Sequence, residues 1–448
     1  MSKQYDLVVI GAGTAAMTAA MRVRAEGKQV AVIDFRPFGG TCALRGCDPK
    51  KMLIGGAHAL DHVRRMHEKG VGGEVRILWP ELMAFKRTFT DPVPQKMEQR
   101  YQDKEIDTFH GKARFTGPNT LQVGDTVLEA KHILLASGAE PVKLNIPGEE
   151  YLMDNEGFLE LENLPDRIVC VGGGYIAAEF SHLAARAGAK VTVLQHGARI
   201  LKEFDADLVG WLMESFSTLG IDVRTNTFVE RIEKIGDAYQ VFSSSEGAQS
   251  MVEADIVVHA AGRAPDYAAL DLNTASVAVE KGRIQLNEYL QSVSNPAVYA
   301  AGDVARKGPP LTPVSSHDAK VVAANVLNGN HRKPNYTGVP SVAFTIPPIA
   351  SAGLNEQQAR EQNIRFRVNS QKASDWFTAR QAAEPIYGFK VLVEEGTDRV
   401  LGAHLVGPHA DEVINVFAFA IRHGHTAQDL KDTMFAYPTG ASDIGYML

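Results

Sequence analysis

The stretch that decides the fold opens the chain, where residues 5–16 read Tyr-Asp-Leu-Val-Val-Ile-Gly-Ala-Gly-Thr-Ala-Ala. Tyr5–Ile10 is a continuous apolar strand, Gly11 and Gly13 permit a tight turn, and an alanine-rich helix follows. The next strand ends on Asp34. Such glycines let a pyrophosphate approach a helix N-terminus, and an acid about 20 residues on binds ribose hydroxyls. The segment predicts a dinucleotide-binding βαβ unit.

The same pattern occurs a second time. Arg167–Val171 is an apolar strand, and the glycines from Gly172 to Gly174 open a helix that runs to about Ala187. Lys190–Leu194 supplies the following strand. Because both units have the order strand, glycine loop, helix and strand, the chain is expected to contain two dinucleotide-binding modules.

A cysteine pair lies between these modules, in residues 39–51 (Gly-Gly-Thr-Cys-Ala-Leu-Arg-Gly-Cys-Asp-Pro-Lys-Lys). Cys42 and Cys47 can store two electrons as a dithiol or disulfide. On an ideal helix, residues five apart rise about 7.5 Å, whereas a disulfide needs Cα atoms roughly 4.4–6.8 Å apart. A bridge therefore requires a bent backbone, for which Gly46 and Pro49 are suited. The alternatives are two buried cysteines that never meet, or half of a zinc site without nearby further ligands.

Composition limits the possible partners. Of the 448 residues, 45% are hydrophobic and 22% charged, which is typical of a globular protein with a substantial core. The net charge of −7 without a basic run argues against nucleic acid. The absence of a long apolar stretch or signal segment predicts no membrane association and a reducing cytoplasm. In that compartment a Cys42–Cys47 bridge would be catalytic, while Cys170, within an apolar strand, is expected to be inert.

Over essentially its whole length the chain resembles the class I pyridine nucleotide–disulfide oxidoreductases, the family of glutathione reductase, dihydrolipoyl dehydrogenase and mercuric reductase. Two nucleotide modules around one cysteine pair suit an electron path from nicotinamide through flavin to disulfide. Further segments that resemble family motifs occur in family order: residues 111–115, 134–138, 261–265, 298–303 and 311–313.

The resemblance implies that FAD and a nicotinamide nucleotide are the cofactors. The residues expected to bind them are Gly11, Gly13, Thr14, Ala15, Asp34, Gly40, Thr41, Lys50, Ala113, Ser137, Gly138, Gly172, Gly174, Tyr175, Ile176, His196, Arg199, Gly262, Arg263, Gly302, Asp303, Leu311 and Thr312. Among these, Asp303 is expected at the flavin ribityl chain. Tyr175 either covers the nicotinamide pocket or is a packed aromatic at a helix start. No metal site is expected.

Catalytic roles also follow from the resemblance. Cys47 corresponds to the flavin-proximal, charge-transfer thiolate, and Cys42 to the outer, interchange thiol. Lys50 and Glu179 correspond to a pair near the flavin N5, where positive charge favours arrival of the hydride.

The second module indicates which nucleotide is used. Relatives that prefer NAD end its second strand with a glutamate, but this chain has Gln195, followed by His196, Arg199 and Lys202. A neutral amide near cations accommodates a 2′-phosphate that a carboxylate would repel. NADPH is therefore favoured over NADH, with a solvated basic loop of no ligand preference as the alternative.

The C-terminal segment departs from the family pattern. Disulfide-reducing members carry a His-Pro-Thr segment and a glutamate five residues after the histidine; here Tyr437 and Ser442 occupy these positions. Tyrosine, with an ordinary pKa of about 10, is a poor base near neutrality. Asp443 either substitutes as a carboxylate or caps the terminus.

The expected fold is α/β, with two Rossmann-like dinucleotide-binding domains and a C-terminal α+β dimerisation domain. The predicted division is 1–140 (FAD), 141–264 (NAD(P)H), 265–335 (FAD, return segment) and 336–448 (dimerisation). Within the first segment, helices are expected over 60–69 and 84–103. The expected protein is a cytoplasmic homodimer with shared active sites that passes electrons from NAD(P)H through flavin to Cys42–Cys47, and then to a small disulfide. A quinone or soft metal ion is the alternative small-molecule acceptor.

Overall fold

The computed structural model describes residues 3–448, which form two compact units. Of the described residues, unit 1 comprises 3–50, 85–142 and 263–336, and unit 2 comprises 51–84, 143–262 and 337–448. The fold is the expected mixture of α/β and α+β parts. Because the two units are cut differently from the four predicted segments, the assignment of those segments to separate domains stays a prediction.

Unit 1 is built on a seven-stranded sheet of order β3-β2-β1-β6-β5-β4, with β19 also paired to β6. The strands β3, β2, β1, β6 and β19 run parallel, and β4 and β5 form an antiparallel extension. Their bounds are β1 (Lys3–Ile10), β2 (Val30–Asp34), β3 (Asp107–His110), β4 (Ala113–Gly117), β5 (Thr120–Val123), β6 (Thr126–Leu135) and β19 (Val298–Ala300).

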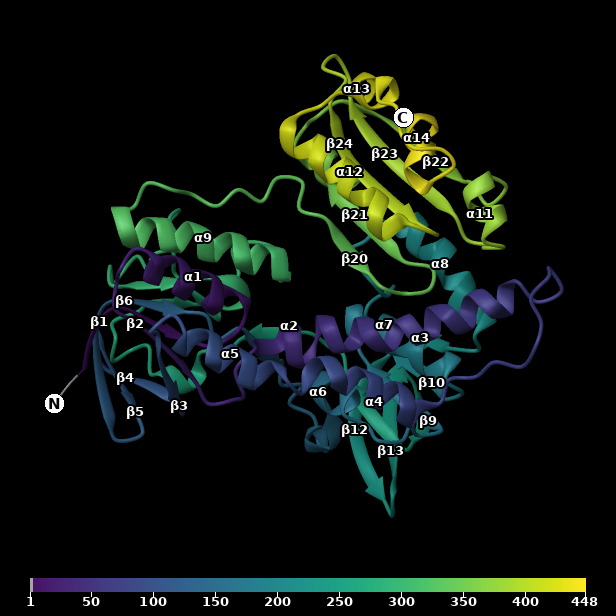
Figure 1. Cartoon of the computed structure of the whole chain (residues 1–448). Helices are drawn as coiled ribbons and strands as arrows, with labels where there is room; N and C mark the ends of the chain where they lie inside the picture. The colour runs from purple at the N-terminus through teal and green to yellow at the C-terminus, as the bar shows by residue number, and fades with distance from the viewer. Residues whose placement is uncertain (1–2) are drawn as a thin grey trace. The chain divides into compact units, whose positions relative to one another are not determined.

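Helices cover this sheet because its parallel strands are apolar on both faces. Figure 1 shows α1 and α9 side by side along it. The remaining elements of unit 1 are α1 (Thr14–Ala25), α2 (Gly40–Arg45), α5 (Val93–Gln102), β7 (Ala139–Pro141), β16 (Arg263–Pro265), η2 (Ala268–Leu270), β17 (Val279–Glu280), β18 (Arg283–Ile284), η3 (Gly302–Val304) and α9 (Thr312–Asn328).

Unit 2 contains a second parallel sheet of order β11-β10-β9-β15-β8, accompanied by an antiparallel meander of three strands. The predicted strands at 167–171 and 190–194 are confirmed as β9 and β10. The bounds in this part are η1 (Glu149–Tyr151), β8 (Leu152–Met153), α6 (Asn155–Leu159), β9 (Arg167–Val171), α7 (Tyr175–Arg186), β10 (Lys190–Leu194), α8 (Ala206–Thr218), β11 (Asp222–Arg224), β12 (Phe228–Ile235), β13 (Ala238–Ser245), β14 (Ala248–Ala254) and β15 (Ile256–His259).

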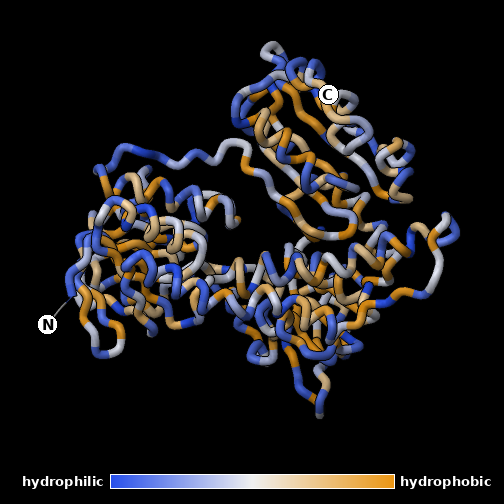
Figure 2. The backbone as a smooth tube through the Cα atoms, viewed as in Figure 1, coloured by the Kyte–Doolittle hydropathy of each residue, from blue (hydrophilic) through white to orange (hydrophobic). Residues whose placement is uncertain are grey.

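The C-terminal part of unit 2 is an antiparallel sheet of order β20-β21-β24-β23-β22, against which α12 packs. The inner strands β23 and β24 are almost wholly buried, as their apolar colouring in Figure 2 suggests. The elements are β20 (Ser341–Ala343), β21 (Ile349–Gly353), α10 (Glu356–Glu361), β22 (Phe366–Lys372), α11 (Phe377–Gln381), β23 (Gly388–Glu394), β24 (Val400–Val406), α12 (Ala410–His423), α13 (Ala427–Asp432), η4 (Gly440–Asp443) and α14 (Ile444–Met447).

Two helices span the boundary between the units, and both differ from the predicted bounds. A helix was expected over 60–69, but α3 already begins at the second cysteine and covers Cys47–Arg65. Helical structure expected over 84–103 is instead divided between α4 (Trp79–Thr90) and α5. The division falls at Pro92, which lacks the N–H that a continuous helix needs.

Exchange of Gly11 for alanine tests how closely the first glycine loop approaches β6. Gly11 has φ +107°, and a Cβ there would lie 2.3 Å from the Ala136 carbonyl oxygen. Gly11→Ala should therefore lower the free energy of unfolding by more than about 2 kcal/mol and reduce the flavin content of the purified protein. The matched control is Gly55→Ala, an exposed position in α3 where a Cβ meets nothing within 4 Å. That change should stabilise by up to about 1 kcal/mol. Equal stability of the two variants would contradict the close approach.

Candidate active site

The two cysteines lie on either side of a break between two helices. Cys42 is in α2, and Cys47 is the first residue of α3. Gly46 between them has φ −151° and ψ −104°, far from helical values. Both cysteines are thiols in this structure, and the two side chains are hydrogen-bonded to each other. The predicted bend is therefore present, and it brings the sulfurs into contact.

The two thiols have opposite proton affinities. The hydrogen bond from Cys42 is the main cause that lowers the pKa of Cys47 to about 6, assisted by Thr312 and the charge of Lys50. Burial and the carboxylate of Asp48 oppose this decrease in the pKa of Cys47. The same hydrogen bond and burial raise the pKa of Cys42. At neutral pH the pair is thus a Cys47 thiolate that accepts a hydrogen bond from a protonated Cys42.

Thr312 reaches the thiolate from the start of α9. Its Oγ1 lies 3.3 Å from the sulfur of Cys47, and its hydrogen bonding also acts on Cys42. The sequence placed Thr312 among the cofactor-binding residues but did not predict this contact. Thr312 and Cys47 are 265 residues apart in the sequence, so no local sequence pattern could predict their contact.

Around the first glycine loop, the backbone is shaped for a close ligand. A Cβ on Gly40 would lie 2.3 Å from the Cα of Gly13, so α2 and the loop are in direct backbone contact. No described side chain caps α1 at Gly13, and its first turn has no acid, so its amides suit a phosphate. Asp34 accepts hydrogen bonds from the amides of Ala12 (2.8 Å) and Arg36 (2.9 Å), which orient its carboxylate beside the loop. These features fit the pyrophosphate and ribose of FAD.

The other predicted flavin residues of unit 1 follow the carboxyl ends of neighbouring parallel strands. Gly11 follows β1, Asp34 ends β2, Ser137 follows β6, and Gly302 follows β19. This edge is where open parallel sheets bind ligands. Unit 1 also contains the remaining predicted residues Thr14, Ala15, Thr41, Lys50, Ala113, Gly138, Arg263, Asp303 and Leu311. Arg263 donates to the Ala139 carbonyl, which indicates a structural contribution at this edge.

The second glycine loop repeats the geometry within unit 2. A Cβ on Gly172 would lie 2.3 Å from the Ala260 carbonyl oxygen, and no described side chain caps α7 at Gly174. Tyr175 is half-buried, with its ring 5.4 Å from that of Phe204 in an edge contact. Burial raises the pKa of Tyr175 to about 12, so its hydroxyl stays protonated. Ile176 and Gly262 lie in the same unit.

The side chains expected to select the nucleotide differ in whether they are exposed and free to contact a ligand. The side chain of Gln195 is buried, and a Cβ on Gly173 or Gly197 would lie about 3 Å from its amide. Arg199 donates to the carbonyls of Leu201, Lys202 and Phe204, so its guanidinium holds the following loop. His196 and Lys202 are exposed. A 2′-phosphate would therefore meet His196 and Lys202 more readily than Arg199.

Glu179 is buried on α7, and its Oε1 accepts a hydrogen bond from the Phe344 amide at 2.8 Å. This contact fixes the carboxylate to the segment between β20 and β21. Lys50 belongs to unit 1 and Glu179 to unit 2, so their expected pairing stays a prediction.

The C-terminal segment uses its polar residues for its own structure. Tyr437 is 80% exposed. Ser442 forms a capping box with Thr439 at the start of η4. Asp443 accepts a hydrogen bond from the Tyr387 hydroxyl at 2.7 Å. Asp443 is thus already occupied by Tyr387 rather than by Tyr437.

Comparisons with known proteins agree with this geometry. Residues 5–319 match the pyridine nucleotide-disulphide oxidoreductase family model, and residues 339–447 match its dimerisation domain. The chain is a class I pyridine nucleotide–disulfide oxidoreductase. Members of this family depend on FAD and a pyridine nucleotide, and the dimerisation domain supports homodimers in the family.

Individual relatives cover nearly the whole chain. It is 32% identical to a glutathione reductase from Burkholderia cepacia over 445 residues, 98% of this chain and 97% of that protein. It is also 32% identical to a mercuric reductase from Bacillus cereus over 447 residues, 98% of this chain and 70% of the relative. The solved HOCl-induced flavoprotein disulfide reductase RclA from Escherichia coli matches with TM-score 0.88 and 28% identity, covering 99% of both chains. A Cu(II) complex of RclA matches similarly, with TM-score 0.88 and 28% identity over 100% of this chain and 99% of that one.

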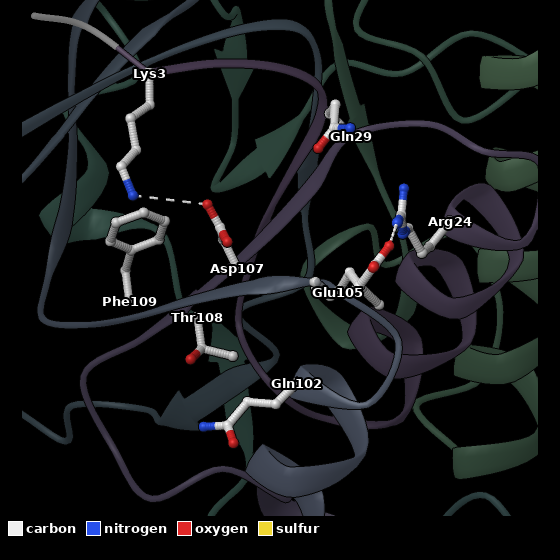
Figure 3. A pocket seen from close by; sticks show the side chains of 9 residues that line it. Lys3, Arg24, Gln29, Gln102, Glu105, Asp107, Thr108 and Phe109 are labelled. Atoms are coloured by element: carbon white, nitrogen blue, oxygen red, sulfur yellow. Dashed lines mark hydrogen bonds and ion pairs between the residues drawn. The ribbon is translucent and has the colours of Figure 1, made fainter.

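Unit 1 also has a pocket whose lining includes none of these residues; Figure 3 shows the side chains that line it. It has a volume of about 640 Å³ and is lined mainly by polar side chains, including Lys3, Arg24, Gln29 and Asp107. Lys3 begins β1 and Asp107 begins β3, whereas the glycine loop follows the other end of β1. The pocket therefore opens at the amino edge of the sheet and is not part of the candidate active site.

Two further findings concern residues 3–448 as a whole. None of the described helices is both long enough and apolar enough to cross a membrane. Within the same range, no three or more His, Cys, Asp or Glu side chains are grouped so that they could hold a metal ion.

Removal of the Thr312 hydroxyl tests the origin of the Cys47 thiolate. Thr312→Val should raise the pKa of Cys47, because the thiolate loses a hydrogen-bond donor. The measurement is the pH dependence of iodoacetamide alkylation at Cys47 in the reduced protein, followed by peptide mass spectrometry. In the unmodified chain the rate should rise through a midpoint near pH 6, and in Thr312→Val the midpoint should lie higher. Thr312→Ser is the control that keeps the hydroxyl; equal midpoints in all three proteins would contradict the assignment.

Proposed function

We propose that this enzyme transfers two electrons from NADPH to the Cys42–Cys47 disulfide and from the resulting dithiol to a small disulfide. The observation that carries the proposal is the thiol pair itself, in which one sulfur is a thiolate and its neighbour a protonated donor. In the net reaction, NADPH, one proton and a disulfide give NADP⁺ and two thiols. FAD, when bound, supplies the acceptor for the hydride of the nicotinamide.

Cys42 and Cys47 each act as the nucleophile in one of the two thiol–disulfide exchange steps. Cys42 is the sulfur that attacks the substrate disulfide, forming a mixed disulfide and releasing the first thiol. Cys47 then attacks the sulfur of Cys42, which releases the second thiol and restores the disulfide. The low pKa of Cys47 supports the second step, since a thiolate is the nucleophile.

NADPH is the proposed donor because the second module ends its strand in an amide instead of a carboxylate. Gln195 lies beneath the glycine loop, and the exposed His196 and Lys202 leave cationic or neutral groups where a 2′-phosphate would approach. NADH remains the less favoured alternative.

A soft metal ion or quinone is the second candidate acceptor. Tyr437 occupies the position of the family histidine, and the nearby Asp443 is hydrogen-bonded to Tyr387. The first attack on a disulfide needs a base for Cys42, whose pKa is raised, but thiolate binding of a metal ion needs no such residue. Oxidation of one dithiol reduces one mercuric ion to metal or two cupric ions to cuprous ions. The relatives named mercuric reductase and the Cu(II) complex of RclA support this alternative.

Turnover with a panel of acceptors tests the proposal. The acceptors are glutathione disulfide, coenzyme A disulfide, lipoamide, a quinone, and mercuric and cupric ions, each with NADPH and NADH as donors. We expect the highest kcat/KM with NADPH and one of the disulfides. Cys42→Ser should abolish disulfide and metal-ion turnover but leave direct reduction of the quinone. Undiminished disulfide turnover in Cys42→Ser would overturn the proposed role of the thiol pair. A clear preference for NADH would overturn the proposed choice of NADPH.

Restoration of a histidine tests the role of the altered C-terminal segment. Tyr437→His should raise disulfide turnover near pH 7 by a factor of up to about 100, because an imidazole can take the proton that tyrosine cannot. Metal-ion turnover should change little. The control Tyr437→Phe removes the hydroxyl without adding a base and should leave disulfide turnover low. An unchanged rate in Tyr437→His would show that proton transfer by this residue does not limit the enzyme.

A further inference from the structure

A buried carboxylate on α9 has no role in the chemistry described above. Asp318 is completely buried, and it lies in the second turn of the helix whose first residue, Thr312, contacts Cys47. Its Oδ2 accepts a hydrogen bond from the Gly302 amide at 3.2 Å, and its Oδ1 accepts one from the Tyr336 hydroxyl at 2.8 Å. All of these residues belong to unit 1.

The first of these contacts holds η3 against α9. Gly302 has φ +73°, and a Cβ there would lie 2.8 Å from Oγ of Ser315, so the Ser315 side chain on α9 packs directly against the backbone of η3. Asp303, the next residue, is the one that the family pattern places at the flavin ribityl chain. The position of Asp303 therefore depends on the hydrogen bond that Gly302 makes to Asp318.

The second contact, with the Tyr336 hydroxyl, connects Asp318 to the loop between η3 and α9. The Tyr336 ring lies so close to Gly308 that a Cβ on this glycine would be 2.6 Å from it. Gly308 lies between η3 and the start of α9. Asp318 thus holds the start of the segment from Asp303 to Thr312 through Gly302, and the middle of this segment, at Gly308, through Tyr336.

We propose that Asp318 is a positioning residue for the flavin, which holds Asp303 and the segment up to Thr312 in their binding arrangement. The inference rests on the FAD dependence of the family and on the proposed contact of Asp303 with the cofactor. A carboxylate can accept from Gly302 and Tyr336 simultaneously, whereas its protonated form has one good acceptor oxygen. Protonation should therefore release one of the two contacts and weaken the hold on η3.

This difference makes the proposal testable by pH. Burial raises the pKa of Asp318 to about 6, although the hydrogen bonds from Tyr336 and Gly302 act in the opposite direction. The titratable groups that act on it are the Tyr336 hydroxyl and the carboxyl of Asp303 on η3. Burial also raises the pKa of Asp303, while Arg263 lowers it. The dissociation constant of FAD should consequently increase as the pH falls through about 6, and a comparison with Asp318 variants separates the contributions of the two carboxyls.

The experiment is the binding of FAD to the apoprotein of the full chain between pH 5 and 8, followed by flavin fluorescence. Asp318→Ala leaves the Gly302 amide without its acceptor and should weaken FAD binding about tenfold or more at pH 7.5. Asp318→Asn keeps the shape and one acceptor oxygen but cannot titrate. It should resemble the protonated carboxyl, so that FAD binds more weakly than to the unmodified chain at pH 7.5, and the part of the pH dependence that Asp318 causes should be lost.

Tyr336→Phe provides an independent test, because it leaves Asp318 in place but removes a hydrogen bond that lowers its pKa. The acid limb of the FAD-binding profile should move to higher pH. Asn325→Ala is the matched control: Asn325 is buried on the same helix, but it bonds to Tyr289 and to the turn after α9 instead of η3. This variant should lower thermal stability without changing the pH profile.

The possible outcomes are distinct. Equal FAD affinity and equal pH profiles for the unmodified chain, Asp318→Ala and Asp318→Asn would overturn the inference and leave the proposed function intact. Failure of the unmodified chain to bind FAD at all would contradict the proposed function itself. If Asp318→Ala does not fold, the pH profiles of Asp318→Asn and Tyr336→Phe still decide, since identical profiles to that of the unmodified chain would overturn the inference.

Discussion

The hydrogen bond between the two cysteine side chains is the interaction on which the rest of the site depends. It stabilises negative charge on Cys47 and keeps the proton on Cys42, so that two chemically identical side chains acquire different functions. This difference arises from the backbone, because Gly46 ends α2 and allows α3 to begin at Cys47. A thiolate at the N-terminus of a helix is also favoured by the helix dipole.

Close approaches between main-chain segments shape the glycine loops of both units and the start of α2. At Gly11, Gly40 and Gly172 a Cβ would lie 2.3 Å from an atom of the neighbouring main chain, so larger residues would push the segments apart. The carboxyl ends of parallel strands then place the ligand-binding loops of each module along one edge. In unit 1 this edge includes α2, which carries Cys42, and the start of α9, where Thr312 contacts Cys47. Within unit 1, the predicted nucleotide-binding loop and the thiol pair are therefore at the same edge of the sheet for a topological reason.

The sequence predicted those parts of the structure that depend on local patterns. The strand bounds of β9 and β10 and the bend between the cysteines follow from apolar runs and glycine positions over a few residues. The start of α3 at Cys47 was not predicted, because the glycine and proline residues around it resemble those of a loop. Local patterns also failed where a polar side chain has a partner far along the chain. The contact of Thr312 with Cys47, the bond of Asp443 to Tyr387 and the two bonds of Asp318 result from tertiary packing. The hydrogen bonds from Arg199 to the carbonyls of its own loop were also not predicted, and its contact with a nucleotide stays a prediction.

The central claim is that Cys42 and Cys47 store electrons in addition to those held by the flavin. Anaerobic titration of the oxidised holoprotein with dithionite measures this capacity directly. The account predicts uptake of two electrons by the flavin and two more by the thiol pair, with the second pair absent in Cys42→Ser. Saturation of the unmodified chain after only the two electrons of the flavin would contradict it.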